Sequence, residues 1–217
     1  MNAKPLELYS LATPNGQKVS IALEEMELNY RAHRVDITKG EQFSNEFIQL
    51  NPNSKIPVLV DPEGDHGKPL PIMESGAILV YLADKTGRFS SKDPAVRCKI
   101  YQWLFFQVAG IGPMFGQFGH FYKFAKDPRD HSYALERYTK ETKRLLAVLD
   151  RQLSQSPYVA TNEVTIADFA TAPWVACLDE FYQASKLLEL EKFTSVHKWL
   201  DLMKKRPAYQ KGSKVCA

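Results

Sequence analysis

The stretch that decides the fold reads Asn53-Ser-Lys-Ile-Pro-Val-Leu-Val-Asp61 and, after a polar loop, Leu70-Pro-Ile-Met-Glu-Ser-Gly-Ala-Ile-Leu79. Pro57 stands at the head of an apolar run that is typical of a buried strand, and proline cannot donate a hydrogen bond to a sheet ladder. A trans peptide bond before Pro57 would push the strand out of line. We therefore predict a cis Ile56–Pro57 bond, with the neighbouring backbone left unpaired.

The second half of this stretch predicts the start of a helix. Glu74 and Ser75 precede an apolar run at helical spacing, so we expect a helix over residues 75–85 with Ser75 at its cap. The free N–H groups at a helix N-terminus bind anions. An unpaired strand end beside such a helix start suits a small extended peptide that carries a free carboxylate.

Composition limits the class of protein. The chain has 217 residues, 44% of them hydrophobic and 24% charged, which is typical of a globular protein. The net charge of +3 is small and forms no basic run, so nucleic-acid binding gains little support. Residues 1–5 lack the apolar core of a signal peptide, and no apolar run is long enough to span a membrane. The three cysteines form no CxxC pair and no metal-ligand spacing, so we expect a reducing, cytoplasmic location.

The first 88 residues alternate between strand and helix patterns. Residues 6–11 and 30–36 are expected strands that flank a helix whose apolar face is Val19, Ala22, Leu23 and Met26. A short helix over residues 43–48 follows, and then come two strands over 56–60 and 70–73 and the helix over 75–85. This order is βαβ, α, ββα, which is the thioredoxin-like arrangement of an α/β sandwich.

The rest of the chain shows only helical patterns. A polar segment with a proline, residues 89–94, is the expected linker between a thioredoxin-like domain (1–88) and an all-helical domain (95–217). In the second domain, glycines and Pro113 are expected to interrupt the first helix near residue 110. Thr165-Ile-Ala-Asp168 is a capping box, which we expect to start a buried helix and to do no chemistry.

Several separated motifs, in this order, resemble a cytosolic glutathione transferase over essentially the whole chain. The finer matches are similar to the bacterial nu class, of the disulfide-bond reductase type, which is itself related to the fungal nitrogen-catabolite regulator that forms a prion. The motifs are Thr13-Pro-Asn-Gly16, Gly40-Glu-Gln-Phe43, Asn51-Pro-Asn53, Glu74-Ser-Gly-Ala-Ile78, Gln102-Trp-Leu-Phe-Phe-Gln107, Gly112-Pro-Met114 and Tyr133-Ala-Leu-Glu-Arg-Tyr138. The resemblance implies glutathione, reduced or as its disulfide, as co-substrate and no metal.

The turn at Thr13 is the expected thiol-activating element. A free thiol is mostly protonated at neutral pH, and lowering its pKa by about two units requires about 2.7 kcal/mol. Thr13 suits the N-cap and Pro14 the first position of the helix, where proline is favoured. The Thr13 hydroxyl, the Asn15 amide and the helix dipole would then act on the glutathione sulfur as the catalytic groups. The alternative is an ordinary turn at the start of a helix.

The resemblance also implies which residues bind glutathione. The backbone of Ile56, next to Pro57, would pair with the cysteinyl unit, while Glu74 and Ser75 would hold the γ-glutamyl end. The glycyl end would meet Gln42 and Lys55. Arg137 matches the second-domain arginine of the family, acting in its own subunit or across a dimer, and the alternative is a solvated helix charge.

A second substrate would lie between the domains. The candidates for its pocket are Phe106, Met114, Phe118 and His120, although phenylalanines in such a dense set are more often core than pocket wall. His66 lies near acidic residues, but a metal site there is not expected.

The predicted function is glutathione-dependent disulfide-bond reduction by a homodimer, with peroxidase and weak conjugating activities on the side. No nucleic acid or membrane partner is expected. The alternatives are a non-catalytic glutathione-fold regulatory protein and a detoxifying conjugase for a specific electrophile. No protein thiol is expected to react, because Cys98 and Cys177 are predicted to be buried and Cys216 to lie in a fraying end.

Overall fold

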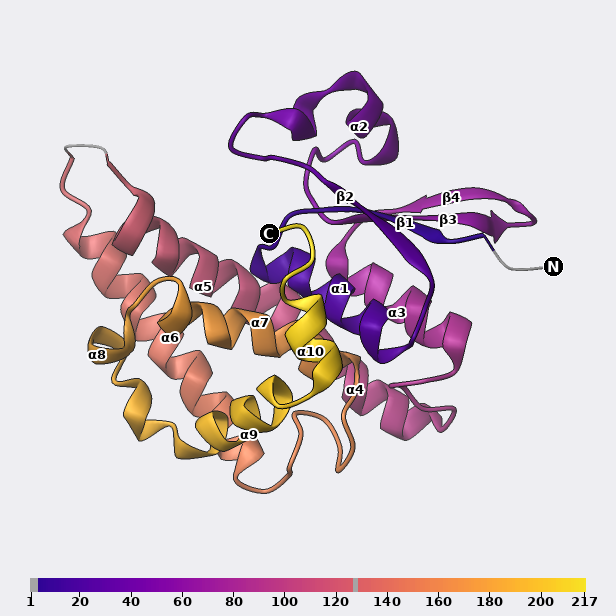
Figure 1. The fold of residues 1–217 in the computed structure, drawn as a ribbon. Coiled ribbons are helices and arrows are strands. Elements are labelled where there is room, and N and C mark those ends of the chain that lie inside the picture. The colour runs from indigo at the N-terminus through magenta and orange to yellow at the C-terminus, as the bar shows by residue number, and fades with distance from the viewer. Residues whose placement is uncertain (1–3, 127–128) are drawn as a thin grey trace. The chain divides into compact units, whose positions relative to one another are not determined.

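The computed structural model describes residues 4–126 and 129–217, and the chain forms two compact units (Figure 1). The first unit ends at Arg88 and also contains Lys205–Ala217, and the second unit is Phe89–Lys204. The sequence predicted that the C-terminal segment belongs to the helical domain and Phe89 to a linker. Phe89 instead packs edge-on against Phe169, with ring centroids 4.9 Å apart, inside the second unit.

A four-stranded mixed sheet forms the centre of the first unit, with the strand order β2-β1-β3-β4. β1 pairs in parallel with β2 and antiparallel with β3, and β4 is antiparallel to β3, as the thioredoxin-like prediction requires. β3 continues to Asp65, although the sequence predicted a loop after Val60; a register shift between Asp61 and Asp65 accommodates the polar residues. The strands are β1 (Leu6–Ser10), β2 (Tyr30–Arg34), β3 (Val58–Asp65) and β4 (Lys68–Ile72).

Helices α1 and α3 lie together on one side of the sheet and α2 lies on the other (Figure 1). The predicted apolar face of α1 is buried, because Val19, Ala22 and Leu23 are fully enclosed. The C-terminal helix α10 packs on α1 so closely that a Cβ at Gly212 would lie 2.6 Å from the Ile21 Cα. The helices of this unit are α1 (Pro14–Glu25), α2 (Asn45–Leu50), α3 (Ser75–Thr86) and α10 (Pro207–Gly212), with a 3₁₀ turn at Glu41–Phe43.

Over its described residues, the second unit contains helices and no strands. The predicted break near residue 110 is wrong, because the chain passes from α4 through a π turn at Gln107–Ile111 into α5. Pro113 falls in the first turn of α5, where a helix tolerates proline. The principal elements are α4 (Pro94–Phe106), α5 (Gly112–Gly119), a π turn at His120–Phe124, α6 (Ser132–Leu153), α7 (Ile166–Glu180), α8 (Ser185–Leu188), a 3₁₀ turn at Leu190–Lys192 and α9 (Thr194–Lys204).

The predicted capping box starts α7 and is confirmed. The Asp168 carboxylate is fully buried and accepts the backbone N–H groups of Thr165 and Val159 and the indole N–H of Trp199, each at 2.9 Å. It therefore joins three segments of the helical unit, which is the structural role that the sequence indicated. Among the described residues, no helix combines the length and apolarity needed to cross a membrane.

Candidate functional site

The turn before α1 forms the predicted helix cap. Thr13 is the N-cap, and its Oγ1 accepts the backbone N–H of Gly16 at 3.3 Å, while Pro14 opens the helix. A hydroxyl that accepts this bond keeps its own hydrogen to donate. A Cβ at Gly16 would lie 2.0 Å from the Leu11 carbonyl oxygen, so the tight turn requires glycine there. Asn15 lies half-buried in the first turn of α1.

The Ile56–Pro57 bond is cis, as predicted. Within the described residues, neither the backbone N–H nor the C=O of Ile56 is hydrogen-bonded. Asn51 holds the preceding loop by donating from Nδ2 to the Lys55 carbonyl at 2.7 Å, whereas the Lys55 side chain is exposed. Ile56 itself packs on the cluster of Val35, Phe47 and Val58. This rigid, unpaired backbone is suited to receiving a short extended peptide.

The start of α3 differs from the prediction in one respect. The N-cap is Glu74, with φ +67° and no side-chain cap bond, and Ser75 is the first helical residue. The sequence placed Ser75 at the cap because it could not show that Glu74 adopts a positive φ. Such a backbone costs about 1–3 kcal/mol for a residue with a side chain, and strain of this kind concentrates at functional sites.

Lys18, which the sequence did not single out, contacts the first residue of this helix. Its side chain is 2% exposed, and its Nζ donates to Ser75 Oγ at 3.3 Å. Burial lowers the pKa of Lys18 to about 7, although the negative charge of Glu74 opposes this shift. The signal in the sequence was a lysine on the buried face of α1, at the position three residues before Ile21 and four before Ala22.

Gln42 lies in the 3₁₀ turn and is half-buried. Its Nε2 reaches the Ile37 carbonyl only at 3.5 Å, and its buried Oε1 has no hydrogen-bond partner among the described residues. A buried acceptor without a partner is uncommon, so Gln42 has hydrogen-bonding capacity left for a ligand.

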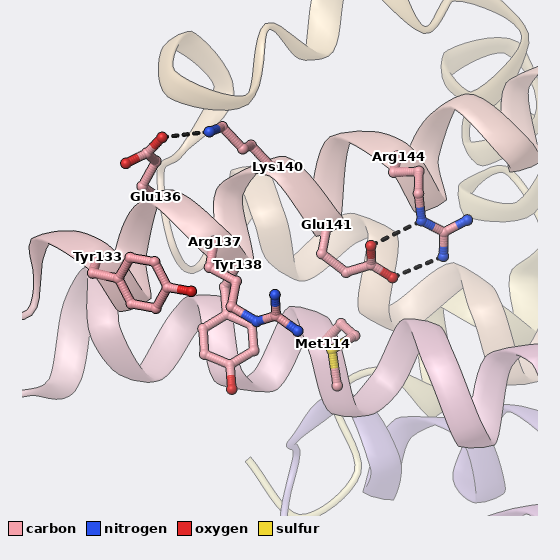
Figure 2. Close-up of a pocket in the computed structure, with 8 residues that line it drawn as sticks. All are labelled: Met114, Tyr133, Glu136, Arg137, Tyr138, Lys140, Glu141 and Arg144. Carbon is pink, nitrogen blue, oxygen red and sulfur yellow. Dashed lines mark hydrogen bonds and ion pairs between the residues drawn. The ribbon is translucent and has the colours of Figure 1, made fainter.

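Arg137 lies in a cleft of about 490 Å³ in the second unit (Figure 2). Four of the charged side chains there form two ion pairs, because Lys140 binds Glu136 and Arg144 binds Glu141 through two bonds of 2.7 and 2.8 Å. Figure 2 shows the Arg137 guanidinium directed toward Met114, and no described carboxylate lies within 4 Å of it. The cleft is lined by Met114, Tyr133, Glu136, Arg137, Tyr138, Lys140, Glu141 and Arg144.

The four residues expected to form a second-substrate pocket have different surroundings. Phe118 is fully buried and stacks on Tyr122 with ring centroids 5.2 Å apart, so it is a core residue. Met114 lines the Arg137 cleft, and Phe106 is half-buried against Trp103. His120 is exposed and lies edge-on to Phe121.

The cysteines correct two predictions. Cys98 is exposed, not buried, because it lies on the outer face of α4. Cys216 does not fray: its carbonyl accepts the Ala12 N–H at 3.1 Å, next to the Thr13 turn, and burial raises the pKa of its thiol. Cys177 is buried as expected, which raises its pKa to about 11. Among the described residues, no cluster of three or more histidine, cysteine or acidic side chains has the geometry of a metal site.

A thioredoxin-like α/β unit followed by an all-helical unit defines the class of glutathione transferase folds. Family models agree: Glutathione S-transferase, N-terminal domain, matches residues 4–84, and Glutathione S-transferase, C-terminal domain, matches residues 109–207. The chain belongs to the glutathione S-transferase family, which confirms the resemblance and the fold class that the sequence predicted.

Three proteins are similar to this chain over nearly its whole length. The disulfide-bond oxidoreductase YfcG of Escherichia coli is 45% identical over 204 residues, which are 94% of this chain and 92% of YfcG. A glutathione transferase from Pseudomonas putida, solved with one glutathione disulfide per subunit, is 50% identical with a TM-score of 0.95 over 98% of this chain and 92% of its own. Ure2p in complex with glutathione is 34% identical with a TM-score of 0.86 over 98% and 100% of the two chains.

Proposed function

We propose that this chain is a glutathione-dependent disulfide-bond reductase in which bound glutathione supplies the attacking thiolate. The observation that carries the proposal is the Thr13 turn, where a hydroxyl with a hydrogen left to donate stands at the N-terminus of a twelve-residue helix. The name of YfcG and the glutathione disulfide bound to the Pseudomonas putida protein support the same chemistry.

Glutathione would bind across the first unit. The unpaired backbone of Ile56 would pair with the cysteinyl unit beside Pro57, and Glu74 with Ser75 would hold the γ-glutamyl end. Gln42 offers a buried oxygen to the glycyl end, and Lys55 offers an exposed ammonium there. Arg137, in the second unit, would also bind glutathione, either in its own subunit or across a dimer.

The energy needed for thiol activation matches what this turn offers. A hydrogen bond to a charged acceptor stabilises by about 1.5–3 kcal/mol. The helix N-terminus adds about 0.3–1 kcal/mol for a negative charge. Together they reach the roughly 2.7 kcal/mol that lowers a thiol pKa by two units. Asn15, in the first turn, would supply a second donor.

The reaction then takes two nucleophilic steps. The glutathione thiolate attacks one sulfur of the substrate disulfide, which forms a mixed disulfide and releases the other sulfur as a thiolate that takes up a proton. A second glutathione thiolate attacks the glutathione sulfur of that mixed disulfide. Glutathione disulfide and a second free thiol leave, so two electrons pass from two glutathiones to the substrate. The same activated thiolate would reduce hydroperoxides and attack aryl halides more slowly.

The assembly we propose is a homodimer in the cytoplasm. On α4, Phe105 is 62% exposed and Val96 is 38% exposed on opposite sides of the helix, and Tyr133 at the start of α6 is 76% exposed. These exposed apolar side chains are available to an interface, and closed twofold dimers are the commonest soluble assembly.

Turnover on a matched substrate panel tests the proposed function. Glutathione mixed disulfides should be reduced faster than hydroperoxides or aryl halides, and the rate should fall strongly in Thr13→Ala. Faster turnover of an aryl halide than of any disulfide would favour a conjugase. Binding of glutathione without turnover of any substrate would favour a regulatory binding protein, which the similarity to Ure2p keeps as the second candidate.

A further inference from the structure

A buried lysine lies beneath the position where the γ-glutamyl carboxylate would bind. Lys18 extends from α1 to the first residue of α3, where its Nζ meets Ser75 Oγ at 3.3 Å. Ser75 is itself 8% exposed, and Lys18 is 2% exposed. Lysine is almost never this deeply buried in proteins unless a charge or an anion compensates it.

The carboxylate of Glu74, on the residue that caps α3, is a charged group whose field acts on Lys18. Other acids near α1 have different partners: Glu25 binds Arg206 at 2.7 Å, and Glu24 binds Lys211 at 2.8 Å and the Tyr30 hydroxyl at 2.6 Å. On the sheet, Asp61 binds the Tyr81 hydroxyl at 2.6 Å and Lys85 at 2.7 Å.

We propose that Lys18 is a positioning residue for the anionic end of bound glutathione: its buried ammonium directs the Ser75 hydroxyl toward the ligand carboxylate and compensates that carboxylate's charge from inside the protein. The inference rests on the proposed glutathione site and goes beyond it, because it assigns a role to a residue that does not touch the ligand.

The direction of the Ser75 hydroxyl follows from hydrogen-bond chemistry. An ammonium only donates, so when Lys18 is charged it occupies a lone pair of Ser75 Oγ, and the hydroxyl hydrogen must point elsewhere. Ser75 is the first residue of α3, and the N–H groups at a helix N-terminus favour an anion as the acceptor. A neutral amine accepts instead, so it draws the hydroxyl hydrogen inward and away from the ligand.

This arrangement couples binding to protonation. The pKa of Lys18 in the free protein is about 7, and a bound carboxylate raises it. Above about pH 7 the complex therefore holds more protons than the free protein, and affinity must fall as the pH rises. A lysine that served only packing would give no such dependence.

The test uses S-hexylglutathione, whose blocked thiol removes the largest competing titration. Calorimetry compares the wild type with Lys18→Met, which keeps the length of the side chain but not the charge. Lys68→Met, which removes an exposed lysine from β4 of the same unit, is the matched control. We expect Lys18→Met to bind about 10- to 100-fold more weakly and Lys68→Met to bind like the wild type.

Two further measurements separate positioning from packing. Wild-type affinity should fall between about pH 7 and about pH 9 more steeply than that of Lys18→Met. An analogue without the γ-glutamyl carboxylate, S-hexyl-4-aminobutyryl-cysteinyl-glycine, should bind the wild type and Lys18→Met equally. If Lys18→Met does not fold, the wild type alone decides the question. Calorimetry at about pH 8 in two buffers of different ionisation enthalpy measures how many protons are taken up on binding. Binding of S-hexylglutathione should take up more protons than binding of the analogue.

Three results would overturn the inference while leaving the glutathione site in place. They are binding of S-hexylglutathione by Lys18→Met within about twofold of the wild type, an equal loss of affinity for the analogue, and equal proton uptake for the two ligands. Failure of the wild type itself to bind S-hexylglutathione would instead overturn the proposed function, together with the inference.

Discussion

Replacing Thr13 by valine removes one hydroxyl from the turn and keeps the shape of the side chain. Two effects should follow, because the Thr13 oxygen accepts the Gly16 N–H and, in the proposed mechanism, its hydrogen is donated to the glutathione sulfur. Loss of the cap should lower the free energy of unfolding by about 0.5–2 kcal/mol. Loss of a donor to the thiolate should raise the pKa of the bound thiol by about one to two units.

The kinetic effect should be larger than the stability effect. Removing one preorganised donor from a developing negative charge slows catalysis by about 10- to 1,000-fold. We expect that range for reduction of a small disulfide by Thr13→Val, and near wild-type rates for Thr13→Ser, which keeps the hydroxyl. Ultraviolet absorbance of the bound thiolate, followed against pH, measures the pKa shift directly.

A second cap variant separates the two effects. Asp93 caps α4 by accepting the N–H groups of Ala95 and Val96 at 2.7 and 3.1 Å. Asp93→Ala should lose comparable stability and no activity at a temperature where both variants are folded. If Thr13→Val reduced the disulfide as fast as Asp93→Ala, with an unchanged thiol pKa, the reasoning about the hydroxyl would be refuted.

Four further predictions follow from the other contacts. Ser75→Ala should weaken glutathione binding by about 1.5–3 kcal/mol in calorimetry, and an unchanged affinity would move the γ-glutamyl site elsewhere. A variant with Cys98, Cys177 and Cys216 changed to serine should keep a near wild-type disulfide-reduction rate; a folded but inactive protein would require a protein-thiol mechanism, with Cys216 beside the Thr13 turn as its first candidate. Asp168→Ala should lower the free energy of unfolding by about 3–5 kcal/mol in denaturant titration, because it leaves three buried N–H donors without an acceptor at about 1–3 kcal/mol each, and a loss under about 1 kcal/mol would contradict this. Sedimentation at micromolar concentration should give about twice the 24.7 kDa chain mass. A monomer would exclude binding of glutathione by Arg137 across subunits.

The features that the sequence predicted correctly are those determined by neighbouring residues. The Thr13 cap with Pro14 behind it, the cis bond before Pro57 and the capping box at Thr165 each depend on a few adjacent side chains. These features can be predicted from sequence because a capping side chain, a proline and a carboxylate three residues later interact within one helical turn.

The features that the sequence did not predict depend on distant residues or on backbone angles. Lys18 meets Ser75 across 57 positions of sequence, so no local pattern connects them. The positive φ of Glu74 has no compositional signal, because glycine is the residue that usually marks such a conformation. The π turn through residue 110 is an exception to the rule that glycine and proline end a helix, since the π turn absorbs the extra residue instead.

The docking of the C-terminal segment on α1 sets the order in which this protein can mature during its synthesis. Ser20 donates to the Gly212 carbonyl at 2.7 Å, Arg206 forms an ion pair with Glu25, and the Ala12 N–H donates to the carbonyl of Cys216. All of these partners leave the ribosome only after the whole of Phe89–Lys204 has been made. The N-terminal part of the first unit therefore emerges first, yet α1 meets α10 last, and until then the surface of α1 that packs on α10 stays accessible to chaperones.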